Sequence, residues 1–338
     1  MVEWRLETLR RSETVRRLLF ARDSRTFGSK RLRRSAASQP ARDWLAPILL
    51  DYYSRDGSTL MMRLLATSPQ IAVGGSYPYE QKLFAYLWRW SRLLTRTEWD
   101  EDEWAPRDLG SILQERDSPL LGPPPWRRRE LLDGADPEQP SITDRTFDFA
   151  WREFSRRAAT ATRVAHRDPQ ADVRYYAEKH LNSWLLDRSE LPPVRLLVLL
   201  RDPRDTYASL IAFREAAKAE LGQRHATDEG DYLRQFVSRQ RERLQWIAGL
   251  TEGPDTAIVR YEEMVRDLPG VARRLGGWLS VELDADTVAN ERRMGWVHRT
   301  APSTEQSIGR WHRDLRDDVA ETIGRELGPE LEALGLRA

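Results

Sequence analysis

Cysteine is absent from the sequence, and histidine is scarce. The lack of cysteine excludes disulfide bonds, thiolate nucleophiles, iron–sulfur clusters and cysteine-type zinc sites, and it suits a reducing compartment. We therefore expect a cytoplasmic protein. His166, His225, His298 and His312 lack the spacing of metal ligands, so we also expect no metal site.

A large charge of one sign and long hydrophobic runs are missing too. Lys plus Arg total 54 against 53 Asp plus Glu, so the net charge of +1 gives no global reason to bind nucleic acid or an anionic membrane. The longest apolar runs, residues 45–50 and 194–200, are far shorter than the roughly 20 residues that cross a bilayer. The N-terminus is rich in arginine but has no apolar core before a cleavage site. The sequence predicts neither a nucleic-acid partner nor membrane insertion.

The remaining composition is that of a globular protein. With 338 residues, of which 40% are hydrophobic and 32% charged, the chain can build a sizeable core. Residues 1–43 are dense in arginine and show a rough helical spacing, which predicts a basic helical arm; a solvated extension is the plainer alternative. Residues 44–338 are expected to form one domain. Within it, residues 98–140 are acidic and then proline-rich, which indicates an irregular insertion or lid.

Two segments share the pattern of an apolar strand, a polar turn and a helix. They begin at residues 46 and 194. Shorter strands are expected at 71–73, 172–176 and 256–260, and further helices from about 141 and at about 229–250, 264–279 and 314–334. Apolar strands that alternate with helices are typical of a parallel sheet covered on both faces, so we predict an α/β fold.

The turn after the first strand has the features of an anion site. Gly57 permits a close approach of the backbone, and Arg55, Ser58 and Thr59 add side-chain donors at the start of a helix. It is not a Walker A loop, because no lysine follows the glycine. An ordinary helix N-cap is the alternative explanation.

The second turn places Arg201 at the end of a strand and Ser209 on the following helix, which Pro203 is suited to start. Both turns belong at the carboxyl edge of a parallel sheet, where α/β proteins bind ligands. Two anion sites on one edge suggest a nucleotide with separated phosphates. A surface ladder of arginine and aspartate is the alternative.

Four motifs in this order resemble those of sulfotransferases that use 3′-phosphoadenosine 5′-phosphosulfate (PAPS). They are residues 54–60, residues 199–209, residues 259–264 and residues 307–311. The resemblance extends over roughly residues 48–315. In the first loop Ser54 replaces the family's proline and Asp56 replaces its serine. A carboxylate at that place would repel the donor unless it turns away, for example toward an arginine.

The resemblance implies how the donor is bound. It assigns Arg55, Gly57, Ser58 and Thr59 to the 5′-phosphosulfate and Tyr261 to the neighbourhood of the adenine. The 3′-phosphate is assigned to a larger set, which comprises Arg201, Ser209, Ser307, Gly309 and Arg310. The implied architecture is a P-loop kinase-like sulfotransferase fold, a parallel sheet flanked by helices with the N-terminal arm and the lid insertion added.

Sulfuryl transfer needs cations to offset the charge of the leaving phosphate and a base for the acceptor hydroxyl. Arg55 is the first cation, and Lys179, in a segment similar to the family's Glu-Lys pair, is the second. An exposed surface lysine is the alternative for Lys179. Glu80, in a Tyr-Pro-Tyr-Glu segment, is the expected base, unless it only caps a helix or pairs with an arginine. His180 is the competing base.

The predicted activity is transfer of a sulfuryl group from PAPS to a hydroxyl of a small molecule, sugar or lipid, without a metal ion. A P-loop-like nucleoside kinase and a non-catalytic nucleotide-binding protein stay open as alternatives. Against the kinase, the first loop lacks its lysine and no Mg²⁺-holding aspartate is evident after a strand. A homo-oligomer is compatible with the sequence.

Overall fold

A five-stranded parallel sheet forms the centre of the computed structural model, in the order β2-β3-β1-β4-β5. The structure describes residues 44–75, 78–93, 142–180, 193–217, 228–290, 303 and 305–336. The strands are β1 (Ala46–Asp51), β2 (Ile71–Val73), β3 (Tyr175–His180), β4 (Arg195–Leu200) and β5 (Thr256–Arg260). The predicted α/β class with a parallel sheet is confirmed. The predicted basic arm (residues 1–43) and the whole predicted lid (residues 98–140) lie outside the described residues.

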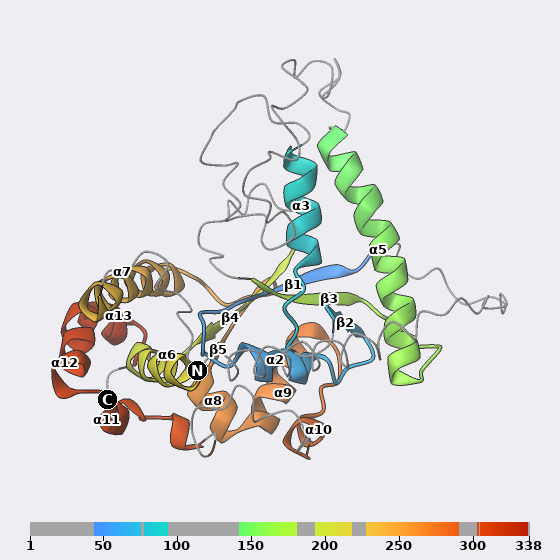
Figure 1. Ribbon diagram of the computed structural model, residues 1–338. Coiled ribbons are helices and arrows are strands. Elements are labelled where there is room, and N and C mark those ends of the chain that lie inside the picture. Colours follow the sequence, from blue (N-terminus) through green and yellow to red (C-terminus); the bar gives the residue numbers. More distant parts are fainter. Residues whose placement is uncertain are drawn as a thin grey trace, which may run out of the picture. The chain divides into compact units, whose positions relative to one another are not determined.

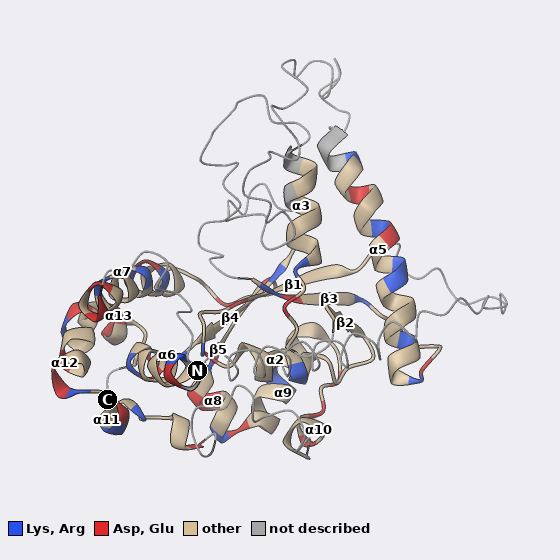
Figure 2. Cartoon of the chain, viewed as in Figure 1, with Lys and Arg blue, Asp and Glu red and all other residues tan. Residues whose placement is uncertain are grey.

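Helices connect the strands and cover both faces of the sheet (Figure 1). The longer helices are α2 (Ser58–Leu65), α3 (Leu83–Leu93), α5 (Ile142–His166), α6 (Pro203–Ala217), α7 (Glu229–Ala248), α9 (Leu268–Leu279) and α12 (Asp317–Glu326). The shorter ones are α8 (Tyr261–Arg266), α10 (Ala285–Asn290), α11 (Trp311–Asp314) and α13 (Gly328–Ala333). Figure 2 shows both signs of charge on α5, α7 and α12, in keeping with the balanced composition.

Alternation along the buried strands produces two hydrophobic cores, one on each face. Leu49 and Val198 belong to the core that α5 and α7 cover, whereas Leu50 and Leu199 belong to the core beneath α2 and α9. These side chains are almost completely buried, and each such burial stabilises the fold by about 1.5–3 kcal/mol. The packing fixes the strand ends, and with them the turns that follow.

Two predicted helices are each divided in the structure. The helix expected at 264–279 begins earlier and consists of α8 and α9, because Asp267 caps a new helix by accepting from the Gly270 N–H at 2.8 Å, with Pro269 in its first turn. The helix expected at 314–334 consists of α12 and α13, again with a proline, Pro329, in the first turn of the second. No helix in the described part of the chain combines the length and apolar character needed to cross a membrane.

Candidate functional site

The turn between β1 and α2 brings backbone N–H groups to the carboxyl edge of the sheet. Arg55 and Gly57 both have left-handed backbone conformations, with φ of 77° and 92°. A Cβ atom on Gly57 would lie 2.6 Å from the Tyr261 ring and 2.7 Å from the Met264 side chain. Position 57 is therefore compatible only with glycine. The turn leads into α2, which begins at the buried Ser58.

Lys179 connects this turn to the segment before α3. Its ammonium group donates to Thr59 Oγ1 (3.0 Å), to the Pro78 carbonyl (2.7 Å) and to Glu80 Oε1 (2.6 Å). Lys179 is 1% exposed, so the alternative of a surface lysine is wrong. Burial lowers the pKa of Lys179, and the adjacent Glu80 opposes that shift. Since the Glu80 side chain is 52% exposed, a buried cation and an accessible carboxylate meet beside the turn.

His180 follows Lys179 in β3, and strand alternation places the two side chains on opposite faces of the sheet. Burial lowers the pKa of His180 to about 4, and the nearby Lys82 adds to this effect while Asp51 opposes it. The imidazole is therefore neutral near pH 7. The structure brings Glu80, rather than His180, to the Lys179 ammonium.

Arg201 joins the first turn to the C-terminal motif. It donates to the Arg55 carbonyl (2.5 Å) and the Ser307 carbonyl (2.6 Å), and its guanidinium lies 4.2 Å from the centre of the Tyr261 ring. The Tyr261 hydroxyl is 2.7 Å from Ser307 Oγ. Arg201 is buried, and its Nε has no hydrogen-bond partner among the residues that the structure describes. Four predicted donor-binding residues, one from each of the four motifs, are thus in direct contact.

Two further predicted residues extend this cluster. Arg55 Nε donates to Ser209 Oγ at 3.2 Å, and the Arg55 guanidinium lies 4.9 Å from the centre of the Phe213 ring. Ser209 is buried on α6, one turn after Asp205. The first and second turns are therefore linked twice, by the Arg55–Ser209 hydrogen bond and by the bond from Arg201 to the Arg55 carbonyl.

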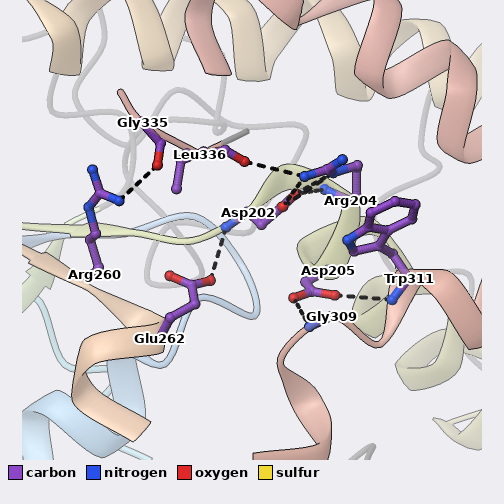
Figure 3. A network of polar contacts seen from close by, with 9 residues as sticks. All are labelled: Asp202, Arg204, Asp205, Arg260, Glu262, Gly309, Trp311, Gly335 and Leu336. Carbon is purple, nitrogen blue, oxygen red and sulfur yellow. Dashed lines mark hydrogen bonds and ion pairs between the residues drawn. The ribbon is translucent and has the colours of Figure 1, made fainter. Parts of the chain in front are cut away.

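Gly309 and Arg310 lie in the segment before α11. The Gly309 N–H donates to Asp205 at 2.7 Å (Figure 3). Arg310 is buried and forms an ion pair with Asp314, with its Nε at 2.8 Å from the carboxylate and an amino group at 2.7 Å. The backbone of this segment faces α6, while the Arg310 guanidinium is paired with α11.

Sequence reasoning did not find the partner of Asp56. The carboxylate is 1% exposed, accepts from the Tyr53 N–H at 2.6 Å, and lies 3.6 Å from an Arg243 amino group. Arg243 also donates to Asp51 (3.1 and 2.8 Å) and to the Leu199 carbonyl (2.5 Å). Asp56 therefore turns into the protein, toward an arginine. The available signal was an arginine on the apolar stripe of α7.

Glu178 is a second residue whose role the sequence analysis does not predict. Its buried carboxylate accepts from the N–H groups of Phe84 (2.8 Å) and Ala85 (3.0 Å), at the start of α3. Burial raises the pKa of Glu178 to about 7, against these two hydrogen bonds and the charge of Lys82. Together, Glu178 and Lys179 hold both ends of the segment that carries Glu80.

A sequence model described as the Sulfotransferase family matches residues 53–285. The chain belongs to the sulfotransferase family. The resemblance inferred from its motifs is thereby confirmed. The matched region of the chain contains the first turn, Lys179, Arg201, Ser209 and Tyr261. The segment from Ser307 to Arg310 follows the match and is tied to it by the contacts described above.

Solved structures of sulfotransferases resemble this chain at low sequence identity. The sulfotransferase domain from the curacin biosynthetic pathway is 14% identical with a TM-score of 0.43, covering 84% of this chain and 98% of that one. Sulfotransferase STF9 from Mycobacterium avium is 16% identical (TM-score 0.41; 87% and 77% covered). Mouse sulfotransferase SULT7A1, complexed with PAP, is 11% identical (TM-score 0.42; 86% and 84% covered). No curated protein matches the chain.

Proposed function

We propose that this sulfotransferase moves a sulfuryl group from PAPS to a hydroxyl of a small molecule, sugar or lipid. The observation that carries the proposal is the contact of Lys179 with both Thr59 and Glu80, which unites a phosphate-binding turn, a buried cation and an accessible carboxylate. A nucleotide-binding protein without catalysis has no need of this arrangement. A kinase is disfavoured because no lysine follows Gly57 in the turn.

The residues present fit an anionic nucleotide donor. Arg201 is buried, and no described residue accepts a hydrogen bond from its Nε; a buried cationic donor in that state favours an anion beside it. The turn at Gly57 has no room for a Cβ atom. We assign Arg55, Gly57, Ser58 and Thr59 to the 5′ side of the nucleotide. Around the 3′-phosphate we place Arg201, Ser209, Ser307, Gly309 and Arg310, with Tyr261 near the adenine.

Bound PAPS would supply the sulfuryl group and leave as adenosine 3′,5′-bisphosphate. Lys179 and Arg55 would offset the negative charge that develops on the leaving phosphate. Glu80 would accept the proton of the acceptor hydroxyl, since its half-exposed carboxylate is held at Oε1 by Lys179. Within the described ranges, no cluster of three or more His, Asp or Glu side chains is placed to hold a metal ion.

Replacing each of the two candidate bases, Glu80 and His180, tests the proposal. Purified protein is incubated with labelled PAPS and a panel of alcohols and phenols, and the same assay is applied to Glu80→Gln, His180→Asn and the exposed control Glu242→Gln. We expect Glu80→Gln to lower kcat with an alcohol by ~10²–10⁴-fold and to bind the bisphosphate normally. An acidic phenol should be less affected, because its proton leaves more readily.

Each alternative has its own outcome in this assay. Full activity of Glu80→Gln together with loss of activity in His180→Asn would transfer the role of base to His180. Full activity of both variants would exclude either residue as an essential base. Absence of transfer to every acceptor, with tight binding of the bisphosphate, would favour the non-catalytic binding protein.

A further inference from the structure

Asp205 holds the segment that carries Arg310 from both sides. It is buried in the first turn of α6, and its carboxylate accepts from the N–H groups of Gly309 (2.7 Å) and Trp311 (3.1 Å) (Figure 3). These two N–H groups flank Arg310 in the chain. A single side chain therefore fixes the backbone on either side of that arginine, across more than a hundred residues of sequence.

Neighbours of Asp205 hold the same segment at its two ends. Arg201, at the end of β4, donates to the Ser307 carbonyl at 2.6 Å. The Arg204 guanidinium lies 4.2 Å from the centre of the Trp311 ring and is fixed by Asp202, with its Nε and an amino group bonded to the carboxylate (Figure 3). The segment thus takes its position from the motif after β4.

The C-terminal residues of the described chain also contact Arg204 and the end of β5. Arg204 donates to the Leu336 carbonyl at 3.3 Å, and Arg260 of β5 donates to the Gly335 carbonyl at 3.1 Å (Figure 3). Arg204 is therefore held at Asp202 and at the C-terminal segment together. These contacts fix the orientation of the guanidinium that packs against the Trp311 ring.

The charge of Asp205 is directed at the segment and not at a ligand. Each carboxylate oxygen accepts one N–H group, Oδ2 from Gly309 and Oδ1 from Trp311. Burial raises the pKa of Asp205, while Arg201 and these two hydrogen bonds oppose the rise. Gly309 has a φ of 63°, a left-handed conformation in which the chain can turn both N–H groups toward one acceptor.

We propose that Asp205 is a positioning residue for the 3′-phosphate subsite and sets the preference for nucleotides that carry a 3′-phosphate. The inference rests on the proposed function, which assigns Ser307, Gly309 and Arg310 to that phosphate. Without the carboxylate, the backbone around Arg310 loses both acceptors. The segment then keeps the contacts of Ser307 with Arg201 and Tyr261 and of Trp311 with Arg204, but the backbone on either side of Arg310 is no longer tied to α6 by the carboxylate.

The test compares two nucleotides that differ only in the 3′-phosphate. Calorimetry measures the Kd of adenosine 3′,5′-bisphosphate and of adenosine 5′-phosphate for wild type, Asp205→Asn, Asp205→Ala and the control Asp255→Asn. Asp255 is exposed and directly precedes β5, so it lies at the opposite, amino edge of the sheet. Circular dichroism establishes that each variant is folded.

For Asp205→Ala we expect the bisphosphate affinity to fall by ~10- to 30-fold and the 5′-phosphate affinity by less than ~3-fold, because two hydrogen bonds to a charged acceptor are lost. Asp205→Asn keeps an amide oxygen for one N–H group and should fall between wild type and Asp205→Ala. The control should retain the wild-type ratio. If Asp205→Ala does not fold, the ratio in Asp205→Asn decides the question.

Equal weakening of both nucleotides, or an unchanged ratio in the folded variants, would overturn the positioning role. In that case selective binding of the bisphosphate by wild type would leave the proposed function intact. If wild type binds neither nucleotide, the proposed function fails, and the role of Asp205 fails with it.

Discussion

Replacing Asp56 with asparagine is expected to stabilise the protein, and to do so more strongly as the pH rises. The carboxylate is buried, and within the described part of the chain its Oδ1 has no hydrogen-bond partner. The Arg243 amino group 3.6 Å from its Oδ2 already bonds Asp51. One guanidinium therefore serves two carboxylates. Burial raises the pKa of Asp56 to about 7, although Arg243 and the Tyr53 N–H oppose the rise and Asp51 adds to it.

The sign of the effect follows from the direction of this shift. The folded-state pKa of Asp56 lies above the ordinary value of 3.8, so the group contributes stability below that value and loses it as the pH rises to about 7. Between about pH 5 and pH 8 the linkage amounts to roughly 2–3 kcal/mol, at about 1.4 kcal/mol for each pH unit. Asparagine has nearly the same shape and does not titrate, so its variant should escape this loss.

Urea unfolding measures the effect as a difference between two proteins. Free energies of unfolding are determined at several pH values for wild type, Asp56→Asn and the exposed control Asp255→Asn. Groups that titrate alike in all three proteins cancel in the difference. A difference in the free energy of unfolding that is the same at every pH reports only the change of side chain. A difference that grows with pH reports the ionisation of Asp56. Parallel curves for wild type and Asp56→Asn, within about 0.5 kcal/mol, would refute the reasoning.

Three further predictions concern donor binding and the need for a metal ion. Arg201→Ala removes the bonds to the Arg55 and Ser307 carbonyls and the unpartnered Nε, so it should weaken binding of adenosine 3′,5′-bisphosphate by ~1.5–3 kcal/mol in calorimetry. ATP should bind poorly to wild type, and equal affinity for ATP and the bisphosphate would contradict a separate 3′-phosphate site. Transfer should survive EDTA, since Arg55 and Lys179 supply the positive charge; complete inhibition that Mg²⁺ reverses would indicate a kinase.

The sequence predicts the two turns of the donor site because their signals are local. Each follows a near-continuous apolar strand, and each precedes a helix with a recognisable start, Gly57 before α2 and Pro203 at the beginning of α6. Both strands begin in the structure within one residue of the predicted positions, 46 and 194. Parallel pairing then places both turns at one edge of the sheet, as expected from the strand pattern alone.

The third strand shows where local signals fail. A strand is predicted at 172–176, whereas β3 comprises Tyr175–His180 and includes Glu178 and Lys179. A hydrophobicity pattern ends a strand at such residues, because a buried charge is costly unless it is paired. Here the partners are Phe84, Ala85 and Glu80, more than ninety residues away in the sequence. No local pattern contains that information.

Asp56 is a second residue whose partner lies far away in the sequence, and here the effect on stability can be measured. Considered within its loop, a carboxylate in place of the family's serine conflicts with anion binding. The conflict is reduced by Arg243, which reaches Asp51 and Asp56 from the buried face of α7, across 192 residues of sequence in the first case. Burial nevertheless raises the pKa of Asp56 to about 7 against the opposing charge of Arg243, so part of the cost of burying this carboxylate is not compensated. The pH dependence of the free energy of unfolding measures this uncompensated cost. The resemblance of the loop to the family motif contains no information about its size.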